Sequence, residues 1–343
     1  MSLLEIRDLE VSFNTPDGVV RAVRGLSFDL DRGKTLAIVG ESGSGKSVST
    51  QSLTGLSRGA HVTGSATFDG IDLLTADEHQ LRGIRGARIG MIFQDPLSSL
   101  HPYYRVGWQI VEMIRAHDRS VSKRAARDRA AQLLSMVGIP HAKDRIGDFP
   151  HQFSGGMRQR VMIAMAMSVE PDLLIADEPT TALDVTVQAQ VLAVMRKLQD
   201  EMGTAIILIT HDLGVVAEMS DEIVVMYAGQ VMERASRRDL FYRHHHPYTE
   251  GLLASLPAQG GKGTRLSPIK GTPPSSINPP DRCPFAPRCP YAFDKCWREN
   301  PLPRVVFGDL SHQSACWLST DEATRREERA RMVASKLSAE EPA

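Results

Sequence analysis

Residues 40–47, GESGSGKS, have the types and spacing needed to hold a chain of nucleotide phosphates. They fit G-x-x-x-x-G-K-[ST] and follow the apolar run TLAIV, which predicts a buried strand. Glycines let backbone N–H groups close around phosphates, Lys46 can reach the β- and γ-phosphates, and Ser47 can offer its hydroxyl to Mg²⁺. The residues expected to surround ATP and Mg²⁺ are Gly40, Ser42, Gly43, Ser44, Gly45, Lys46, Ser47 and Val48.

Two adjacent carboxylates end a second apolar run, LLIADEP, at residues 173–179. Asp177 at the end of the predicted strand can hold the Mg²⁺ shell, and Glu178 can polarise a water for in-line attack on the γ-phosphate. A strand that ends in Asp-Glu is weak evidence alone. Its position after a phosphate loop makes an ATP-hydrolysing site the stronger interpretation.

A second anion-binding helix start is predicted at Ser154, Gly155 and Gly156, within FSGGMRQR. Ser154 can cap the helix, and the glycines leave backbone amides exposed. One ATP needs one phosphate loop. A second anion site is therefore redundant unless it serves a nucleotide held by another subunit, and a simple capped helix is the alternative.

The amino-acid composition indicates which class of protein this is. The chain has 343 residues, of which 42% are hydrophobic and 24% charged, as in a globular protein with a substantial core. Forty basic against 41 acidic residues give no reason to expect nucleic-acid binding. The sequence shows no signal peptide and no run of about 18 apolar residues that would cross a membrane. We therefore expect a cytosolic protein, in which disulfides are rare.

Apolar runs that alternate with helical periodicity predict an α/β fold with a parallel sheet. Short strands with turns precede the phosphate loop, which predicts an N-terminal antiparallel β subdomain. The predicted domains are residues 1–240 for nucleotide binding, with a helical subdomain at about 95–170, then an irregular segment at 241–330 and a charged tail at 331–343.

The motifs together resemble the nucleotide-binding subunit of an ATP-binding cassette (ABC) transporter, a P-loop NTPase, over residues 3 to about 240. They occur in the family order: phosphate loop, IFQD, SGG, the Asp-Glu strand, ALD and THD. The resemblance implies a head-to-tail dimer in which the Ser-Gly-Gly helix of one subunit completes the ATP site of the other. It also implies that Gln94 senses the γ-phosphate and Mg²⁺, that His211 contacts the γ-phosphate, that Asp184 communicates across the dimer, and that Phe13 stacks on adenine. An ordinary core aromatic is the alternative for Phe13.

Residues 244–257, 271–280 and 283–296 resemble the C-terminal extension of the D-type ATPase subunits of oligopeptide and dipeptide importers. This implies a second ATPase subunit in a heterodimer, two transmembrane permease subunits, an extracytoplasmic peptide-binding protein, and a place at the cytoplasmic face of the cell membrane. Related importers for nickel or glutathione, or a regulatory ATPase without transport, are the alternatives. For the three histidines at 244–246, we expect solvated loop residues, because neighbouring side chains rarely converge on one ion; a metal site is the alternative.

All four cysteines lie in this extension, with the spacing C-x5-C-x6-C-x19-C: Cys283, Cys289, Cys296 and Cys316. Disulfides, unrelated buried thiols, a zinc site and a [4Fe–4S] cluster are the possible interpretations. A cytosolic location disfavours disulfides. Zinc sites typically have closer cysteine pairs, whereas wider loops with prolines suit a cluster. We expect a structural [4Fe–4S] cluster, with zinc as the alternative.

Overall fold

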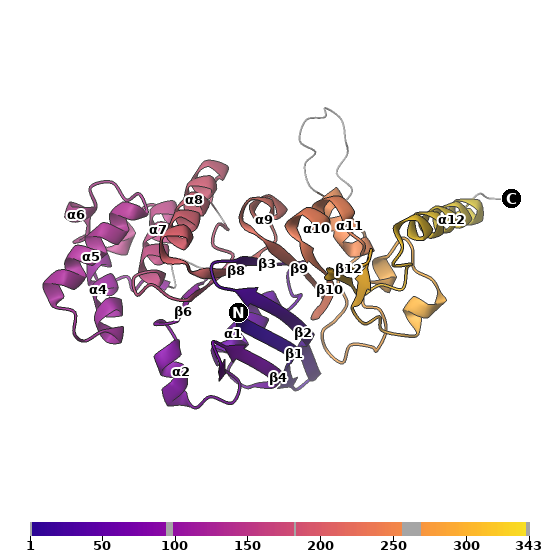
Figure 1. Ribbon diagram of the computed structural model, residues 1–343, viewed down its shortest axis with the longest axis horizontal. Coiled ribbons are helices and arrows are strands. Elements are labelled where there is room, and N and C mark those ends of the chain that lie inside the picture. The colour runs from indigo at the N-terminus through magenta and orange to yellow at the C-terminus, as the bar shows by residue number, and fades with distance from the viewer. Residues whose placement is uncertain (1, 94–98, 182, 256–268, 341–343) are drawn as a thin grey trace.

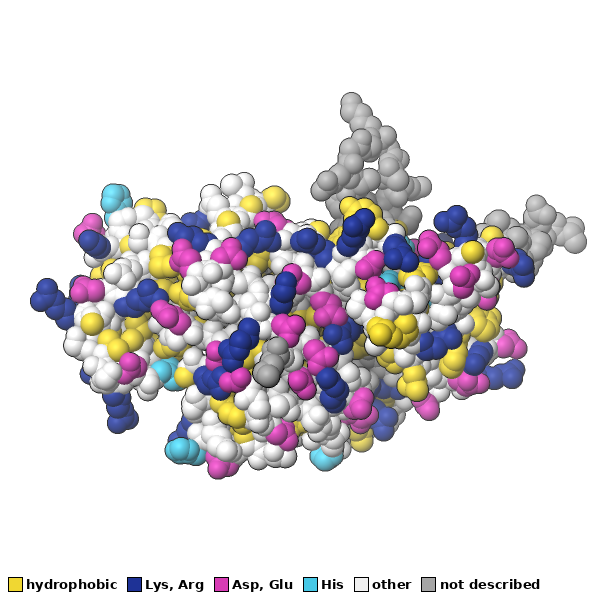
Figure 2. Space-filling view, viewed as in Figure 1, with side chains coloured by type: hydrophobic (Ala, Val, Ile, Leu, Met, Phe, Trp, Pro, Cys, Tyr) yellow, Lys and Arg dark blue, Asp and Glu magenta, His cyan; other side chains and the backbone are white. Residues whose placement is uncertain are grey.

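The computed structural model describes residues 2–93, 99–181, 183–255 and 269–340. Gln94, predicted to sense the γ-phosphate, lies outside the described residues. The molecule is elongated, with a helical lobe at one end, two sheets in the middle and the C-terminal extension at the other end (Figure 1). Basic and acidic side chains are interspersed over the face shown in Figure 2.

A mixed sheet of eight strands forms the centre of the fold, in the order β11-β12-β10-β9-β3-β8-β7-β6. Neighbouring strands from β9 to β6 run parallel, as alternating strands and helices predicted. β3, β7 and β8 are buried along their whole length because helices and the smaller sheet cover both faces. Its strands are β3 (Thr35–Val39), β6 (Ile89–Ile92), β7 (Leu173–Asp177), β8 (Ala205–Thr210), β9 (Glu222–Tyr227), β10 (Gln230–Ser236), β11 (Arg304–Val306) and β12 (Asp309–Ser314).

A second, antiparallel sheet has the order β2-β1-β4-β5 and confirms the predicted N-terminal β subdomain. Apolar side chains from its inner face join those of β3, β7 and β8 in one buried cluster. The cluster also includes Leu53 of the helix that follows the phosphate loop, so this helix packs into the same core. The strands are β1 (Ser2–Thr15), β2 (Gly18–Asp31), β4 (Ala60–Phe68) and β5 (Ile71–Asp72).

Helices flank the sheets, and α4 to α7 make up the helical lobe (Figure 1). Apolar residues spaced three and four apart place Val106, Ile110, Val111 and Ile114 of α4 in the core of this lobe. The helices are α1 (Lys46–Leu53), α2 (Glu78–Ile84), α4 (Val106–His117), α5 (Lys123–Met136), α6 (Ala142–Arg145), α7 (Gly155–Ala166), α8 (Val185–Met202), α9 (Leu213–Met219), α10 (Arg237–Arg243), α11 (Pro247–Ala254) and α12 (Glu322–Glu340). Of these described helices, none combines the length and the apolar character needed to cross a membrane.

The C-terminal extension is built onto the main sheet. β12 pairs antiparallel with β10, which makes the extension continuous with the nucleotide-binding part. A third buried cluster joins Ala37 and Val39 of β3 to Tyr248, Cys283 and Phe285. The strand that leads into the phosphate loop therefore shares a core with the cysteine segment.

The expectation that the three histidines are solvated is wrong. His245 and His246 are buried, and their backbone N–H groups donate to the buried carboxylate of Glu233. His246 is the N-cap of α11, where its Nδ1 accepts a hydrogen bond from the N–H of Tyr248 at 3.0 Å. The two histidines therefore form structural hydrogen bonds. The sequence pattern could not predict the bonds to Glu233, because this residue lies far away in the sequence.

Candidate ATP-binding site

The phosphate loop connects β3 to α1 and has the backbone of a phosphate-binding turn. Gly40 and Gly45 have φ of 152° and 96°. A Cβ on Gly40 would lie 2.1 Å from the Met226 carbonyl oxygen, and one on Gly45 would lie 2.1 Å from that of Ala22. Only glycine fits at these two positions. Because Gly45 is the N-cap of α1 and has no side chain to cap it, the first amides of the helix remain available to a phosphate.

Lys46 lies along the loop that it is predicted to serve. Its Nζ donates to the carbonyl oxygens of Gly40 at 2.8 Å and Glu41 at 2.9 Å. Burial lowers the pKa of Lys46, against the opposing attraction of Glu178, Asp177 and Glu41. A nucleotide phosphate would offer a stronger acceptor than these carbonyls. The buried hydroxyl of Ser44 has no hydrogen-bond partner among the described residues, which fits a loop made to receive a polar ligand.

Ser47 and Asp177 meet where Mg²⁺ is expected. Ser47 Oγ donates to Asp177 Oδ1 at 2.9 Å, although 130 residues separate them. Burial raises the pKa of Asp177, and the hydrogen bond from Ser47 opposes this effect. A cation would reverse the balance by favouring the carboxylate. A hydroxyl and a carboxylate are suitable oxygen ligands for Mg²⁺.

Glu178 is held beside these ligands in an unusual backbone conformation, with φ of 49°. Thr181 Oγ1 donates to Glu178 Oε2 at 2.9 Å, and His211 Nδ1 lies 3.3 Å from Oε1. Burial disfavours the charged carboxylate, but the hydrogen bonds from Thr181 and His211 outweigh it and lower the pKa of Glu178. The side chain is thus a carboxylate at neutral pH, as a base that accepts a proton from water must be.

Thr181 is a site residue that the sequence interpretation missed. It lies three residues after Glu178, and only the tight turn after β7 brings its hydroxyl back to the carboxylate. A threonine in a loop has no pattern of its own that predicts this role.

Not every residue predicted to bind ATP lies beside the phosphate loop. Ser154 caps α7 by accepting from the N–H of Met157 at 3.3 Å, and Ser154 and Gly155 are exposed. Figure 1 places α7 apart from α1. The Ser-Gly-Gly helix start therefore faces solvent, where a second subunit could reach it.

Asp184 and Phe13 are described by their local roles. Asp184 caps α8, because its carboxylate accepts from the N–H of Val187 at 2.9 Å. Phe13 is half-buried near the end of β1 and, like Val48 of α1, packs against the buried cluster between the two sheets. Both the adenine-stacking role and the core role of Phe13 are compatible with this position.

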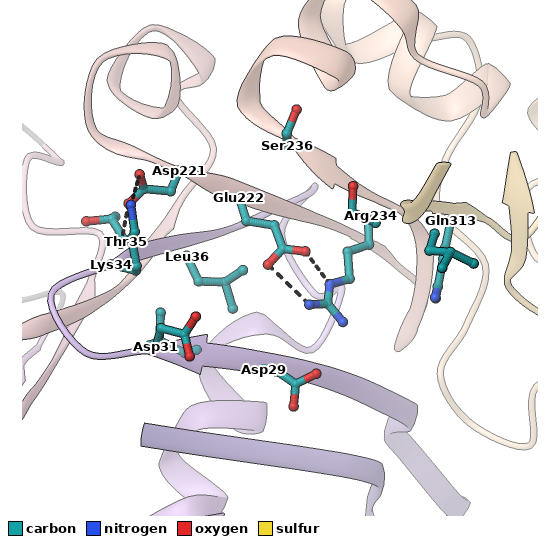
Figure 3. Close-up of a pocket in the computed structure, with 13 residues that line it drawn as sticks. Asp29, Asp31, Lys34, Thr35, Leu36, Asp221, Glu222, Arg234, Ser236 and Gln313 are labelled. Atoms are coloured by element: carbon teal, nitrogen blue, oxygen red, sulfur yellow. Dashed lines mark hydrogen bonds and ion pairs between the residues drawn. The ribbon is translucent and has the colours of Figure 1, made fainter. Parts of the chain in front are cut away.

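A different hollow, of about 480 Å³, lies at the amino ends of β3 and β9, whereas the phosphate loop follows the carboxyl end of β3 (Figure 3). Four of its charged side chains form two ion pairs. Arg234 Nε donates to Glu222 at 2.5 Å, and Lys34 lies 3.3 Å from Asp221. This hollow is separate from the predicted ATP site.

Comparison with known proteins identifies the family. Residues 23–181 match the ABC transporter family model, and residues 232–296 match the C-terminal region of oligopeptide/dipeptide transporters. The dipeptide transport ATP-binding protein DppD of Bacillus subtilis is 51% identical over 94% of this chain and 96% of its own length. The chain belongs to the ABC transporter ATP-binding family. The oligopeptide transport ATP-binding protein OppD of Escherichia coli is 49% identical over 94% of both chains.

Solved structures confirm the fold of this ABC protein. A dimeric ATP-binding cassette in a post-hydrolysis state with ADP and phosphate superposes with a TM-score of 0.63 at 26% identity, over 68% of this chain and 99% of that chain. A component of an ABC transporter complex from Clostridium perfringens gives a TM-score of 0.60 at 29% identity, over 71% and 91% of the two chains. The predicted fold class and family resemblance are thus confirmed.

Proposed function

We propose that this chain is the ATP-hydrolysing subunit of an ABC importer that powers uptake of dipeptides or oligopeptides. The observation that carries the proposal is that relatives named as dipeptide and oligopeptide transport ATP-binding proteins match along 94% of the chain, extension included. An importer for nickel, glutathione or another solute is the alternative, because the ATPase subunit need not touch the cargo.

The geometry supports a direct route for hydrolysis. The phosphate loop and Lys46 would bind the phosphates, and Ser47 and Asp177 would hold Mg²⁺, which would supply positive charge beside them. Glu178 accepts a proton from the attacking water as general base, and Thr181 and His211 keep its carboxylate oriented. His211, whose side chain is 61% exposed, can then turn to the γ-phosphate.

A second ATPase subunit completes each site in this proposal. The amides of the exposed Gly155 and the half-buried Gly156 at the start of α7 would contact the γ-phosphate of the nucleotide on the other subunit. A Cβ on Gly156 would lie 2.5 Å from Val187 Cγ1, so glycine also lets α7 and α8 pack closely there. We propose a heterodimer that closes on two ATP molecules and is opened by hydrolysis.

The permease subunits are proposed to dock on an exposed aromatic cluster at the start of the helical lobe. Tyr104 stacks on Trp108 with ring centroids 4.2 Å apart, and His101 lies 4.6 Å from Tyr104. Tyr103 is 83% exposed, which is unusual for a large aromatic side chain in water. Docking there would hold this subunit at the cytoplasmic face of the membrane. The closing and opening of the ATPase dimer would then act directly on the permease.

Reconstitution tests the proposed function. The chain is purified with its permeases and second ATPase, placed in proteoliposomes with the peptide-binding protein, and supplied with a labelled dipeptide and ATP. We expect uptake that is lost in Lys46→Ala and retained in the control Lys197→Ala, whose side chain is 58% exposed. Uptake or ATPase stimulation by nickel or glutathione, with none by peptides, would contradict the peptide assignment.

For the cysteines, we propose a [4Fe–4S] cluster, with zinc as the alternative. All four line one small apolar cavity beside Phe285, Trp317 and Leu318. Burial raises the pKa of Cys283 to about 11 and of Cys289 and Cys316 to about 12, so the metal-free thiols are protonated at neutral pH. A set of four thiols among apolar groups suits a thiophilic metal centre.

The cavity itself measures about 10 Å³, room for roughly one water molecule. Within the described ranges, no group of three or more His, Cys, Asp or Glu side chains is arranged to hold a metal ion. The cysteine loops would therefore have to spread to accept a cluster.

Iron, sulfide and zinc analysis of anaerobically purified protein separates the two metals. We expect iron and acid-labile sulfide in the wild type, and loss of both with faster proteolysis of residues 283–316 in Cys283→Ser. Unchanged metal content and protease resistance in this variant would contradict the proposed metal centre.

A further inference from the structure

Two residues of the C-terminal extension contact the phosphate loop. Arg288, which lies between Cys283 and Cys289, forms a two-pronged ion pair with Glu41 at 2.7 and 3.0 Å. Tyr248 accepts a hydrogen bond at its hydroxyl from the N–H of Glu41 at 2.9 Å. Glu41 directly follows Gly40, so the extension touches the rim of the loop that is expected to bind ATP.

The arginine is fully engaged. All five of its N–H donors have acceptors: two on the Glu41 carboxylate, and one each on the Tyr227 hydroxyl, the Ile269 carbonyl and the Lys270 carbonyl. Its side chain is 5% exposed, and that of Glu41 is 25% exposed. Such a buried, bidentate pair is geometrically specific, and the removal of one member leaves the other charge without compensation.

Tyr248 is equally well fixed. Its side chain is fully buried, and its ring packs against those of Tyr227 and Phe285 at centroid distances of 4.6 and 5.3 Å. Phe285 lies two residues after Cys283, within the same buried cluster. The hydroxyl that holds the Glu41 amide is therefore supported by the cysteine segment.

Four residues thus contact Glu41: Tyr248 at its N–H, Arg288 at its carboxylate, and Lys46 and the Ser44 N–H at its carbonyl oxygen. When Lys46 turns to a nucleotide phosphate, its contact is lost, and the two contacts from the extension remain beside the one within the loop. We propose that Arg288 and Tyr248 are positioning residues that hold the phosphate loop in its ATP-binding conformation. The affinity for ATP then depends on the extension.

This inference rests on the proposed binding of ATP at residues 40–47, and the experiment keeps the two apart. The Kd and KM for ATP and the kcat are measured for wild type, Arg288→Gln, Glu41→Gln and the double variant. Saturable ATP binding by the wild type, lost in Lys46→Ala, tests the proposed function alone. If the wild type showed no saturable ATP binding, both the ATP site and the positioning role would be overturned.

For the positioning role, we expect each single variant to raise the Kd and KM roughly tenfold, within the usual range for coupling between two sites, with little change in kcat. We expect the double variant to be no weaker than the weaker single variant, because the pair acts as a unit. Independent, additive effects, or unchanged Kd values in the singles, would overturn the inference.

Tyr248→Phe provides a milder test, because it removes only the hydroxyl and leaves the aromatic packing in place. We expect a several-fold rise in KM with little change in kcat. The controls are Tyr242→Phe, where the side chain is 82% exposed, and Arg298→Gln, where it is 76% exposed. A KM for Tyr248→Phe equal to that of the controls would contradict its role even if Arg288→Gln failed to fold.

Discussion

Acidification should destabilise the extension through His246. Its Nδ1 accepts from the N–H of Tyr248, so a proton on that nitrogen would place two donors face to face. Burial lowers the pKa of His246 to about 3, against the attraction of the Glu233 carboxylate. His245 and Arg329 also act on it, and the four cysteine thiols line the same small cavity. The folded protein therefore keeps this histidine neutral, whereas the unfolded chain protonates it near its ordinary value of 6.5.

The sign and size of the effect follow from proton linkage. Below pH 6.5 the unfolded state binds more protons at this site than the folded state, so stability falls as the pH falls. From pH 7 to pH 5 the loss is about 2 kcal/mol at 1.36 kcal/mol for each pH unit below the unfolded pKa. Since pH 5 lies well above the folded pKa, this figure depends almost only on the unfolded value.

Urea unfolding at pH 7 and pH 5, followed by tryptophan fluorescence, measures the effect, because Trp297 and Trp317 lie in the extension. His246→Asn retains an N-cap acceptor but does not titrate. We expect the variant to be less stable than wild type at pH 7 but to lose about 2 kcal/mol less than wild type on acidification. His79→Asn, at an exposed position, is the control. Equal acid losses in wild type and His246→Asn would refute the reasoning.

Three further predictions concern the ATP site. Glu178→Gln should bind ATP normally and accumulate as a closed dimer while kcat falls roughly 10²- to 10⁴-fold, as for loss of a general base; normal turnover would contradict this role. Gly40→Ala should destabilise the protein by at least about 2 kcal/mol in urea unfolding, because of its positive φ and the Met226 carbonyl, whereas Gly83→Ala, which meets no atom within 4 Å, should not. Phe13→Ala should weaken ATP binding roughly 5-fold or more if the ring stacks on adenine, and an unchanged Kd would favour the core role.

Local pattern was enough to predict the central elements. The run TLAIV is β3, LLIAD is β7 and AIILIT lies within β8, because strands buried on both faces must be apolar throughout. The phosphate loop was also predictable, since its residue types follow a fixed short spacing directly after a buried strand. The meeting of Ser47 with Asp177 agrees with the expectation that both side chains would hold Mg²⁺.

Contacts between distant segments were not predictable in the same way. The burial of His245 and His246 depends on Glu233, and the hold on Glu41 depends on Arg288, 247 residues away. Neither Glu41, an unspecified position of the loop pattern, nor Arg288, one of many arginines, has a sequence signal of its own.

The sequence by itself determined the strands, the phosphate loop and the chemistry of the carboxylates, because these depend on residue type and short spacing. Only the tertiary structure decided which side chains of the extension contact the phosphate loop and which histidines are buried. Those outcomes depend on how the extension folds back onto β3, β9 and β10, and the free energy of that packing comes from contacts between residues that are neighbours only in space.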